Sequence, residues 1–336
     1  MEKFYPDFAQ RFAVLLAQLK GKKIAVVGHA RPDGDCIGSQ VAFARTLRTL
    51  GCDVVCVNTD VVPRRLEFLV QDVSFVRPDQ YADKDRLAIF VDCADHARPG
   101  DKIKALFPQP FANFDHHLSN VGYAQHNFVD AGSAATCEIL AGVFIDANLT
   151  IDRAAAQALY VGILTDTGQF RYNSTSRRTF LLGAELLALG AVPSVAGYHL
   201  YERETHGKLK LLQHFLTSLR LECSGRVCIG ILKEGVFAET GTTAEDTEGL
   251  VDYARSIEGV DIGVLIEERP GMIKASLRAK EPAYRVDQIA ARFGGGGHAS
   301  AAGLNVKGMT LGEFYPKLVA EITQQLTQVE AEKFQS

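Results

Sequence analysis

The residues that decide the fold are KKIAVVGHARPDGDCIGSQ, residues 22–40. Their first part, Lys22 to Gly28, is short, apolar and rich in β-branched side chains, which is typical of a buried strand. The polar loop HARPDGD follows, and it holds His29, Asp33 and Asp35. Apolar residues then recur at helical spacing from Ile37 to Leu50, and Gly51 stops this pattern. The stretch therefore predicts a strand, a polar loop and a helix in direct succession.

The same alternation continues along the first half of the chain. Further strands are predicted for DVVCVN (53–58), RLAIFVDCAD (86–95) and PFANFDHH (110–117). Helices are predicted up to Phe144, with Ser133 as the N-cap, and from Arg153 to Leu164. Alternating strands and helices favour a mostly parallel sheet with helices on both faces. The active site of such a sheet lies beyond the carboxyl ends of its strands.

The second half of the chain has a different pattern. Helical segments are predicted for Phe180–Leu189 and for the charged region Tyr198–Leu219. They are followed by RVCIGIL (226–232), a helix around 248–257, and two strands, DIGVLIEE and MIKASLRA. This order indicates a separate, smaller α/β domain. We therefore expect a first domain over residues 1–190, a linker over 191–215 and a second domain over 216–336.

Composition excludes several classes of protein. The chain of 336 residues has 36 Lys and Arg against 40 Asp and Glu, a net charge of −4. General nucleic-acid coat proteins need a broad basic surface instead. The N-terminus lacks the apolar core of a signal peptide, and no stretch is long and apolar enough to span a bilayer. The seven cysteines form no CxxC pair, which predicts buried, reduced thiols in a cytoplasmic protein.

Four acidic and histidine-containing clusters fall at the ends of predicted elements. They are HARPDGD with His29, Asp33 and Asp35; VDCAD with Asp92; FDHH with Asp115, His116 and His117; and LTDTGQF with Asp166. Taken singly, each could be a turn residue, a helix cap or a surface histidine. Together, parallel topology would bring them to one crevice, where several carboxylates require a counter-charge. Divalent metal ions would supply that charge.

The mixture of ligands limits which metal is expected. Carboxylates and imidazoles without thiolates suit Mn²⁺, with Mg²⁺ or Co²⁺ as substitutes, better than structural zinc. The number of ligands is sufficient for two ions. A pair of ions about 3.5–4 Å apart is a common device for hydrolysing phosphate esters. The clusters therefore predict a two-metal phosphoesterase site.

The glycine-rich loop FGGGGHASAAG, residues 293–303, is the remaining motif. Consecutive glycines let backbone N–H groups approach an anion closely, and the stretch after them could open a helix whose N-terminus favours phosphate. A flexible turn is the simpler interpretation. The neighbouring side chains favour an anion site, with substrate-binding candidates Arg278, Gly295, Gly296, His298 and Ser300. The loop is neither a Walker A motif nor a Rossmann fingerprint.

These motifs resemble those of a known family, the DHH phosphoesterases, in the correct order and over nearly the whole chain. HARPDGDCIGS is similar to the first motif, VDCAD to the second, FDHH to the motif that names the family, and GILTDTGQF to the fourth. FGGGGHASAAG resembles the signature of the DHH-associated C-terminal domain. One departure is Cys36, where the family is expected to have alanine. The resemblance implies a Rossmann-like DHH domain, a helical linker and a smaller α/β domain, with the active site between the domains.

The resemblance also implies roles for single residues. One manganese ion would be held by His29, Asp33 and Asp92. The second would be held by Asp35, Asp92, His116 and Asp166, with Asp92 bridging. His117 would stabilise the phosphate or give a proton to the leaving oxygen, and Asp115 would orient the histidines. Arg278 and the loop around Gly295, Gly296 and His298 would bind the terminal phosphate or base of the substrate.

Length and motif spelling favour the branch of nanoRNases and pAp phosphatases, for which a homodimer is plausible. This branch would release mononucleotides from very short RNA and dephosphorylate 3′-phosphoadenosine 5′-phosphate (pAp). Linear or cyclic dinucleotides, such as pApA or c-di-AMP, and inorganic polyphosphate remain alternative substrates. A non-catalytic nucleotide sensor is a further alternative.

Overall fold

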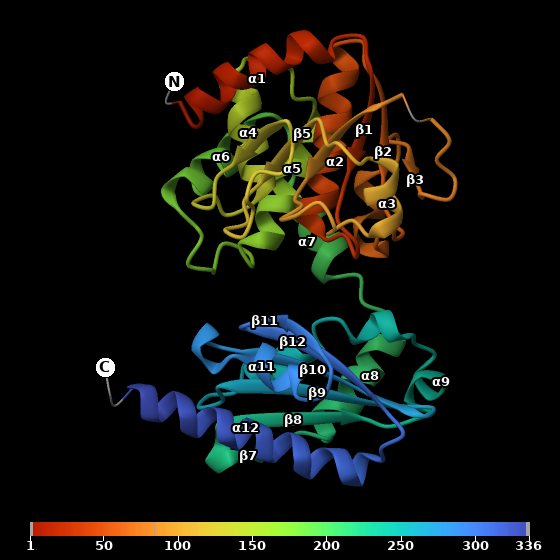
Figure 1. Ribbon diagram of the computed structural model, residues 1–336, viewed down its shortest axis with the longest axis vertical. Coiled ribbons are helices and arrows are strands. Elements are labelled where there is room, and N and C mark those ends of the chain that lie inside the picture. The colour runs from red at the N-terminus through yellow and green to blue at the C-terminus, as the bar shows by residue number, and fades with distance from the viewer. Residues whose placement is uncertain (1–2, 84, 334–336) are drawn as a thin grey trace. The chain divides into compact units, whose positions relative to one another are not determined.

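The computed structural model describes residues 3–83 and 85–333, and the chain divides into two compact units, Met1–Arg203 and Glu204–Ser336 (Figure 1). The division falls between α7 (Pro193–Tyr201) and α8 (His206–Thr217). Thr205 caps α8 by accepting a hydrogen bond from the Lys208 N–H, so the helical region begins anew there. Each unit has its own sheet and its own buried core.

The first unit is built on a six-stranded sheet in the order β3-β2-β1-β4-β5-β6, and every neighbouring pair is parallel. Its strands are β1 (Lys23–Val27), β2 (Asp53–Val57), β3 (Phe75–Val76), β4 (Leu87–Val91), β5 (Ala112–Asp115) and β6 (His126–Val129). This order is that of the Rossmann fold, in which the order reverses between the first and fourth strands. The predicted Rossmann-like parallel sheet is confirmed.

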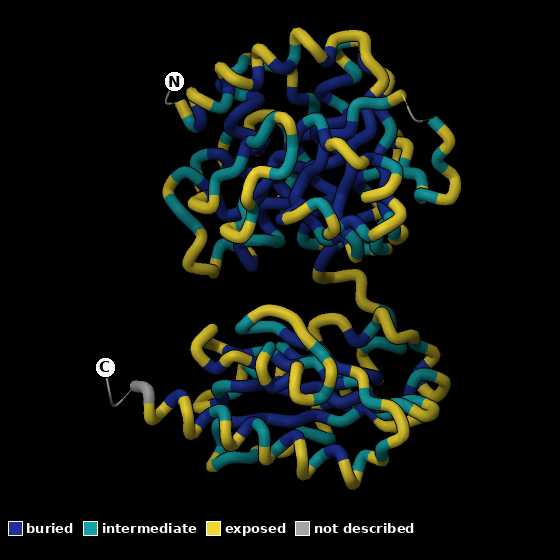
Figure 2. The backbone as a smooth tube through the Cα atoms, in the orientation of Figure 1, coloured by how far each residue is buried: buried dark blue, intermediate teal, exposed yellow. Residues whose placement is uncertain are grey.

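Helices cover this sheet on both faces. They are α1 (Pro6–Leu19), α2 (Gly34–Thr49), α3 (Asp101–Leu106), α4 (Thr136–Asp146), α5 (Arg153–Asp166) and α6 (Arg177–Ala188), besides α7. The larger core packs α1, α2, α4 and α5 against one face, and a smaller core under α3 covers the other. Figure 2 shows that the centre of this unit is buried. Phe12, Phe43 and Phe114 pack edge to face at its middle.

The second unit contains a mixed six-stranded sheet in the order β11-β12-β10-β9-β8-β7. Its strands are β7 (Arg220–Glu222), β8 (Val227–Leu232), β9 (Ile262–Arg269), β10 (Met272–Ala279), β11 (Gly296–His298) and β12 (Ala301–Lys307). Its helices, besides α8, are α9 (Val236–Thr240), α10 (Leu250–Arg255), α11 (Val286–Ala291) and α12 (Leu311–Lys333). The α11–α12 pair covers one face, and α8, α9 and α10 cover part of the other.

The predicted cap of α4 is wrong. The helix begins at Thr136, and Ser133 lies outside its first turn, where its hydroxyl contacts Tyr5 and Asp130 instead. The N–H groups at the start of α4 are satisfied from a distant element, because the Asp35 carboxylate accepts from Thr136 at 2.7 Å and from Cys137 at 2.8 Å. A local sequence signal cannot reveal a cap that comes from another helix.

Two expectations from composition can be compared with the structure. All seven cysteines are free thiols, six of them buried and Cys223 half-buried. Within residues 3–83 and 85–333, no single helix is long and apolar enough to cross a membrane. The two helices Arg177–Ala188 and Pro193–Tyr201 meet that test only as a pair, and they are bent by 106° to each other.

Candidate metal and phosphoester site

The predicted residues lie at the carboxyl ends of the strands in the first unit. His29 follows β1 by two residues, Asp92 comes directly after β4, and Asp115 is the last residue of β5. His116 and His117 continue from β5. Strands β1 and β4 are neighbours at the point where the strand order reverses, which is the usual ligand-binding crevice of such a sheet. The fold itself therefore brings these segments together.

Two helix ends complete the crevice. Asp33 is the N-cap of α2, and its Oδ1 accepts from the N–H groups of Asp35 and Cys36, both at 3.1 Å. This cap turns Asp35 inward, where its side chain is fully buried. Asp166 is the last residue of α5. Burial of an acidic side chain is unfavourable unless it is paired or hydrogen-bonded. Asp35 meets this condition, because its carboxylate accepts hydrogen bonds from the N–H groups of Thr136 and Cys137.

Three groups of these side chains have ligand atoms within 4.8 Å of one another. The groups are His29 with Asp33 and Asp92, Asp35 with His116 and Asp166, and Asp92 with His116 and His117. Asp92 belongs to two groups, and His116 to two. The first group is the same as the first ligand set that the motifs imply. The second group contains the second ligand set without Asp92, and Asp92 instead shares the third group with His116. The metal-binding roles themselves remain predictions.

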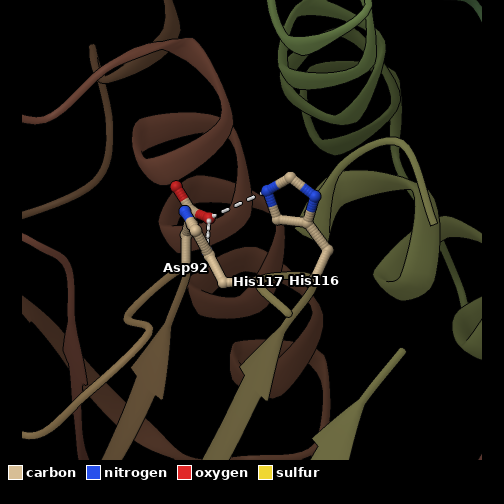
Figure 3. A group of neighbouring side chains, drawn as sticks. All are labelled: Asp92, His116 and His117. Atoms are coloured by element: carbon tan, nitrogen blue, oxygen red, sulfur yellow. Dashed lines mark ion pairs between the residues drawn. The ribbon is translucent and has the colours of Figure 1, made fainter. Parts of the chain in front are cut away.

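The carboxylate of Asp92 divides its two oxygens between the groups. His29 Nε2 lies 3.2 Å from Oδ2, while His116 Nε2 and His117 Nδ1 lie 3.6 and 3.7 Å from Oδ1. Figure 3 shows the Asp92 carboxylate facing both histidines from the end of the neighbouring strand. The backbone of Asp92 has φ 56°, a left-handed conformation that residues other than glycine, asparagine and aspartate rarely adopt. Strain of this kind is concentrated at functional sites.

Two of the histidines present the same nitrogen to the crevice. The Nδ1–H of His29 donates to the Ala30 carbonyl at 2.9 Å, and the Nδ1–H of His116 donates to the Ser133 carbonyl at 3.4 Å. A carbonyl only accepts, so Nδ1 carries a proton in both residues, and Nε2 is the nitrogen that faces the carboxylates. Metal-ligating histidines are typically held by such a bond from their second nitrogen.

His117 is held differently. Its Nδ1–H donates to Asp115 Oδ1 at 2.8 Å, and the other oxygen of Asp115 accepts from Asn120 Nδ2 at 2.7 Å. The Asn120 amide also contacts Asn113 Oδ1 at 2.7 Å. The hydrogen bond from His117 to the buried Asp115 raises the pKa of the imidazole. The arrangement therefore favours a protonated His117 with Nε2 as its second donor, as a proton donor requires.

The electrostatics of the crevice favour a bound cation. Burial, followed by the charges of Asp92 and Asp166, raises the pKa of Asp35 well above its usual range. Burial also raises the pKa of Asp166 to about 6, although its hydrogen bond with His116 acts the other way. For His116, burial lowers the pKa, but the Asp166 hydrogen bond and the charges of Asp35 and Asp92 outweigh it and raise the pKa to about 10. These directions describe crowded anions that lack counter-charge.

The donor set fits a divalent metal of the Mn²⁺ or Mg²⁺ kind. Every ligand atom in the three groups is a carboxylate oxygen or an imidazole nitrogen. No cysteine sulfur takes part in them within the described residues, although Cys36 and Cys137 are buried close by. Oxygen and imidazole donors without thiolate suit these ions better than structural zinc. The residues present therefore fit the group that the motifs predict.

We expect Mn²⁺ binding to release protons and to weaken as the pH falls. At pH 8 an imidazole with a pKa of about 10 is protonated, so His116 must lose a proton to bind the ion. At pH 6 the carboxyl of Asp166, with a pKa of about 6, is partly protonated and adds to the release. Calorimetric titrations at both pH values, in buffers of different ionisation enthalpy, measure the number of protons released for each ion bound. Binding without proton release, and with equal affinity at pH 6 and 8, would contradict the assignment.

A strained turn follows Asp166 directly, and the motif analysis did not reveal it. Gly168, Gln169 and Phe170 have φ values of 54°, 63° and 62°, three left-handed residues in succession. The buried Thr167 supports the turn, because its Oγ1 accepts from the Phe170 N–H at 3.0 Å. A β-carbon on Gly168 would lie 2.4 Å from the Tyr172 ring, so any other residue would have to displace that ring and also adopt a left-handed φ. This turn sets the direction in which the backbone leaves the site after Asp166.

In the second unit the glycine-rich loop forms a hairpin, and the predicted helix after it is wrong. Gly296–His298 is strand β11 and Ala301–Lys307 is strand β12, joined through Ala299 and Ser300. Ala302 and Leu304 alternate as buried residues against the core of this unit. Pairing of the whole of β12 with β10 outweighs the helical propensity of the alanines. Ser300 therefore lies in the hairpin turn.

The predicted substrate-binding side chains share one face of this sheet. Arg278 lies opposite Ala301 on the neighbouring strand, and Ala301 lies opposite His298. Directly opposed residues point to the same face, so the small Ala301 separates two basic side chains. Gly295 is required for close packing, because a β-carbon there would lie 2.3 Å from the Gly303 carbonyl. Gly296 faces open space.

Comparison with known proteins gives two family matches. The sequence model described as DHH family, N-terminal domain, matches residues 23–163, and the model of the DHHA1 domain matches residues 226–328. The two matches together cover every strand of the two sheets except β7. They include all the residues of the first-unit crevice except Asp166, which follows the first match by three positions.

Individual relatives are similar over nearly their full length. The bifunctional oligoribonuclease and PAP phosphatase NrnA of Thermus thermophilus is 27% identical over 325 residues, covering 96% of this chain and 96% of that protein. The protein of the same name from Bacillus subtilis is 25% identical, covering 83% of this chain and 87% of its own length. A solved exopolyphosphatase-related protein from Bacteroides fragilis has a TM-score of 0.86 at 23% identity, over 96% of this chain and 98% of that one. The last likeness is one of fold.

Proposed function

We infer the activity of this chain from the family to which it belongs: it is a DHH-family protein whose N-terminal domain is joined to a DHHA1 domain, and it hydrolyses phosphoester bonds. The crevice at the end of the first sheet is the site for this reaction. The observation that supports this placement best is the sharing of Asp92 between two groups of potential metal ligands.

We propose that the enzyme uses two Mn²⁺ ions, releases mononucleotides from short RNA and dephosphorylates pAp. Relatives of similar length carry names that describe both activities. Two ions bound there would lower the pKa of an attacking water and neutralise charge on the phosphoryl oxygens. His29, Asp33 and Asp92 would hold one ion, and Asp35, Asp92, His116 and Asp166 the other. Mg²⁺ or Co²⁺ could substitute, because they accept similar donors.

His117 is the proton donor in this proposal. Its bond to Asp115 leaves Nε2 as the atom that meets the substrate, and the same bond favours the protonated imidazole through the raised pKa. Asn120 and Asn113 hold Asp115 from behind. The donor is therefore oriented before substrate arrives, which lowers the cost of reaching the transition state.

The DHHA1 face with Arg278 and His298 would bind the terminal phosphate or base of the substrate. Replacing Arg278 by alanine is expected to raise KM about 10- to 100-fold and to change kcat little. The rise in KM corresponds to about 1.4–2.7 kcal/mol, which is typical for loss of a charged hydrogen bond to phosphate. Lys274→Ala is the matched control. Lys274 lies on the same face of β10, but Glu267 already pairs with it at 2.8 Å. Equal kinetics for both variants would remove Arg278 from the substrate site.

The preferred substrate is tested by side-by-side kinetics of the metal-loaded full chain. The values of kcat/KM for a three-nucleotide RNA, pAp, pApA, c-di-AMP and polyphosphate report which transition state the site fits best. We expect the first two to be highest. A preference for a dinucleotide would move the assignment to that alternative. Tight binding of pAp without turnover in saturating Mn²⁺ would instead indicate a nucleotide sensor.

We also propose that the protein works in the cytoplasm. The seven cysteines are free thiols, and six of them are buried. Proteins of oxidising compartments use cysteines mainly in disulfides, so this usage supports a reducing compartment.

A further inference from the structure

Thr136, the first residue of α4, contacts two of the predicted metal ligands at once. Its backbone N–H donates to Asp35 Oδ2 at 2.7 Å, and its hydroxyl donates to Asp92 Oδ1 at 3.2 Å. An ionised carboxylate only accepts, so the direction of both bonds is fixed. Thr136 is fully buried. None of the motifs that predicted the site includes this residue.

The contact with Asp92 determines how that carboxylate is oriented. Oδ1 faces His116 at 3.6 Å, and Oδ2 faces His29 at 3.2 Å. Rotation of the carboxylate by about a quarter turn around its Cβ–Cγ bond would move Oδ1 away from His116 and Oδ2 away from His29. The left-handed backbone of Asp92 sets the direction of the side chain but leaves this final rotation open. The Thr136 hydroxyl, bound to Oδ1, restricts the rotation.

The contact with Asp35 fixes the other carboxylate from the same turn of helix. Asp35 Oδ1 accepts from the Cys137 N–H at 2.8 Å, beside the bond that Oδ2 makes with Thr136. Both donors belong to the first turn of an eleven-residue helix, whose N-terminus favours a negative charge. The first turn of α4 therefore holds two carboxylates, one through its backbone and one through the Thr136 side chain.

We propose that Thr136 is a positioning residue that sets the orientation of Asp92 between the two ligand groups. The inference rests on the proposed function, because it assumes that these groups hold divalent ions. The backbone and side-chain contributions of Thr136 can be separated. Substitution by valine keeps the N–H bond to Asp35 and the branched shape, and it removes only the hydroxyl.

The test compares metal-stripped full-length variants titrated with Mn²⁺ in a calorimeter and assayed for release of mononucleotides from short RNA. Thr136→Val is expected to weaken Mn²⁺ binding about 10- to 100-fold, as loss of a ligand's hydrogen-bond partner typically does. Its kcat is expected to fall while KM stays within about twofold. Thr136→Ser, which restores the hydroxyl, is expected to recover both values.

Thr46→Val is the matched control. Thr46 is buried in α2 of the same unit, and its hydroxyl has no hydrogen-bond partner among the described residues. The same substitution there should leave Mn²⁺ affinity and kcat unchanged. If Thr136→Val does not fold, Thr136→Ser and Thr136→Ala give an equivalent comparison, since they differ only by the hydroxyl.

The outcomes distinguish this inference from the proposed function. Wild-type Mn²⁺ affinity and kcat in Thr136→Val, or equal defects in the valine and serine variants, would overturn the positioning role and leave the function intact. A lower melting temperature alone would show that Thr136 serves only packing and would overturn it too. If the wild-type chain itself binds no Mn²⁺, the proposed metal site fails, and the inference fails with it.

Discussion

Replacing Asp92 by asparagine is expected to lower kcat/KM by at least about 10³-fold, or about 4 kcal/mol of transition-state stabilisation. Asp92 belongs to two of the three ligand groups, so loss of its charge weakens both proposed ion positions. Asparagine is the suitable replacement, because it matches aspartate in shape and tolerates the left-handed φ of 56°. The measurement is steady-state release of mononucleotides in saturating Mn²⁺.

Two further observations separate loss of metal binding from loss of the fold. Mn²⁺ should raise the melting temperature of the wild-type chain, because an ion that binds only the folded state stabilises it. It should not raise that of Asp92→Asn. Asp95→Asn is the control, since Asp95 is exposed and its turn bonds to the Ala97 and Arg98 N–H groups can be kept by asparagine. Wild-type turnover by Asp92→Asn would remove Asp92 from the metal site.

Replacing His117 by asparagine is expected to lower kcat about 10²- to 10⁴-fold, the usual contribution of a general acid. The asparagine amide can still donate to Asp115, which now accepts from His117 Nδ1 at 2.8 Å, but it cannot give a proton to the leaving oxygen. Mn²⁺ affinity should stay within about threefold of wild type. His116→Asn should lower both kcat and Mn²⁺ affinity, because His116 forms one ligand group together with Asp35 and Asp166.

The role of His117 can be tested further through the leaving group. A p-nitrophenyl ester releases an anion that needs no protonation, so the defect of His117→Asn should be much smaller with such a substrate. An equal defect with both kinds of substrate would indicate that His117 binds a metal ion instead. That alternative has a structural basis, because His117 Nδ1 also lies 3.7 Å from Asp92.

The fold and the site of the first unit could be predicted because both depend on local patterns. Short apolar strands ending in polar clusters predicted a parallel sheet, and parallel topology brings strand ends such as His29 and Asp92 to the same edge. Of the predicted ligands, His29 and Asp92 therefore lie just beyond strand ends, whereas Asp33, Asp35 and Asp166 lie at helix ends. No long-range information was needed to bring His29 and Asp92 together.

The supporting contacts could not be predicted, because they join elements far apart in the chain. Thr136 lies 44 positions from Asp92 and 101 from Asp35. Asn120 lies in a loop without periodicity, and its contact with Asp115 depends on how that loop folds back. The misplaced cap at Ser133 has the same origin, because the true partner of the α4 N-terminus is Asp35.

The glycine-rich hairpin was mispredicted for a different reason. Alanine-rich sequence after a glycine run has helical propensity, and that signal is weak compared with tertiary pairing. Residues 301–307 pair in register with residues 272–278 of β10, which no local pattern reveals. Arg278 and His298, which were predicted together, lie in one row of neighbouring strands, and their role in substrate binding stays a prediction.

The most direct test of a metal-dependent phosphoesterase is the release of mononucleotides from a three-nucleotide RNA before and after removal of metal. The full-length chain is stripped with chelator, assayed, and assayed again after Mn²⁺ is returned. The account predicts that activity is lost on stripping and restored by Mn²⁺, with phosphate release from pAp following the same course. Turnover that persists at the same rate in the stripped chain would contradict it, because the crowded carboxylates of the crevice would then work without a cation.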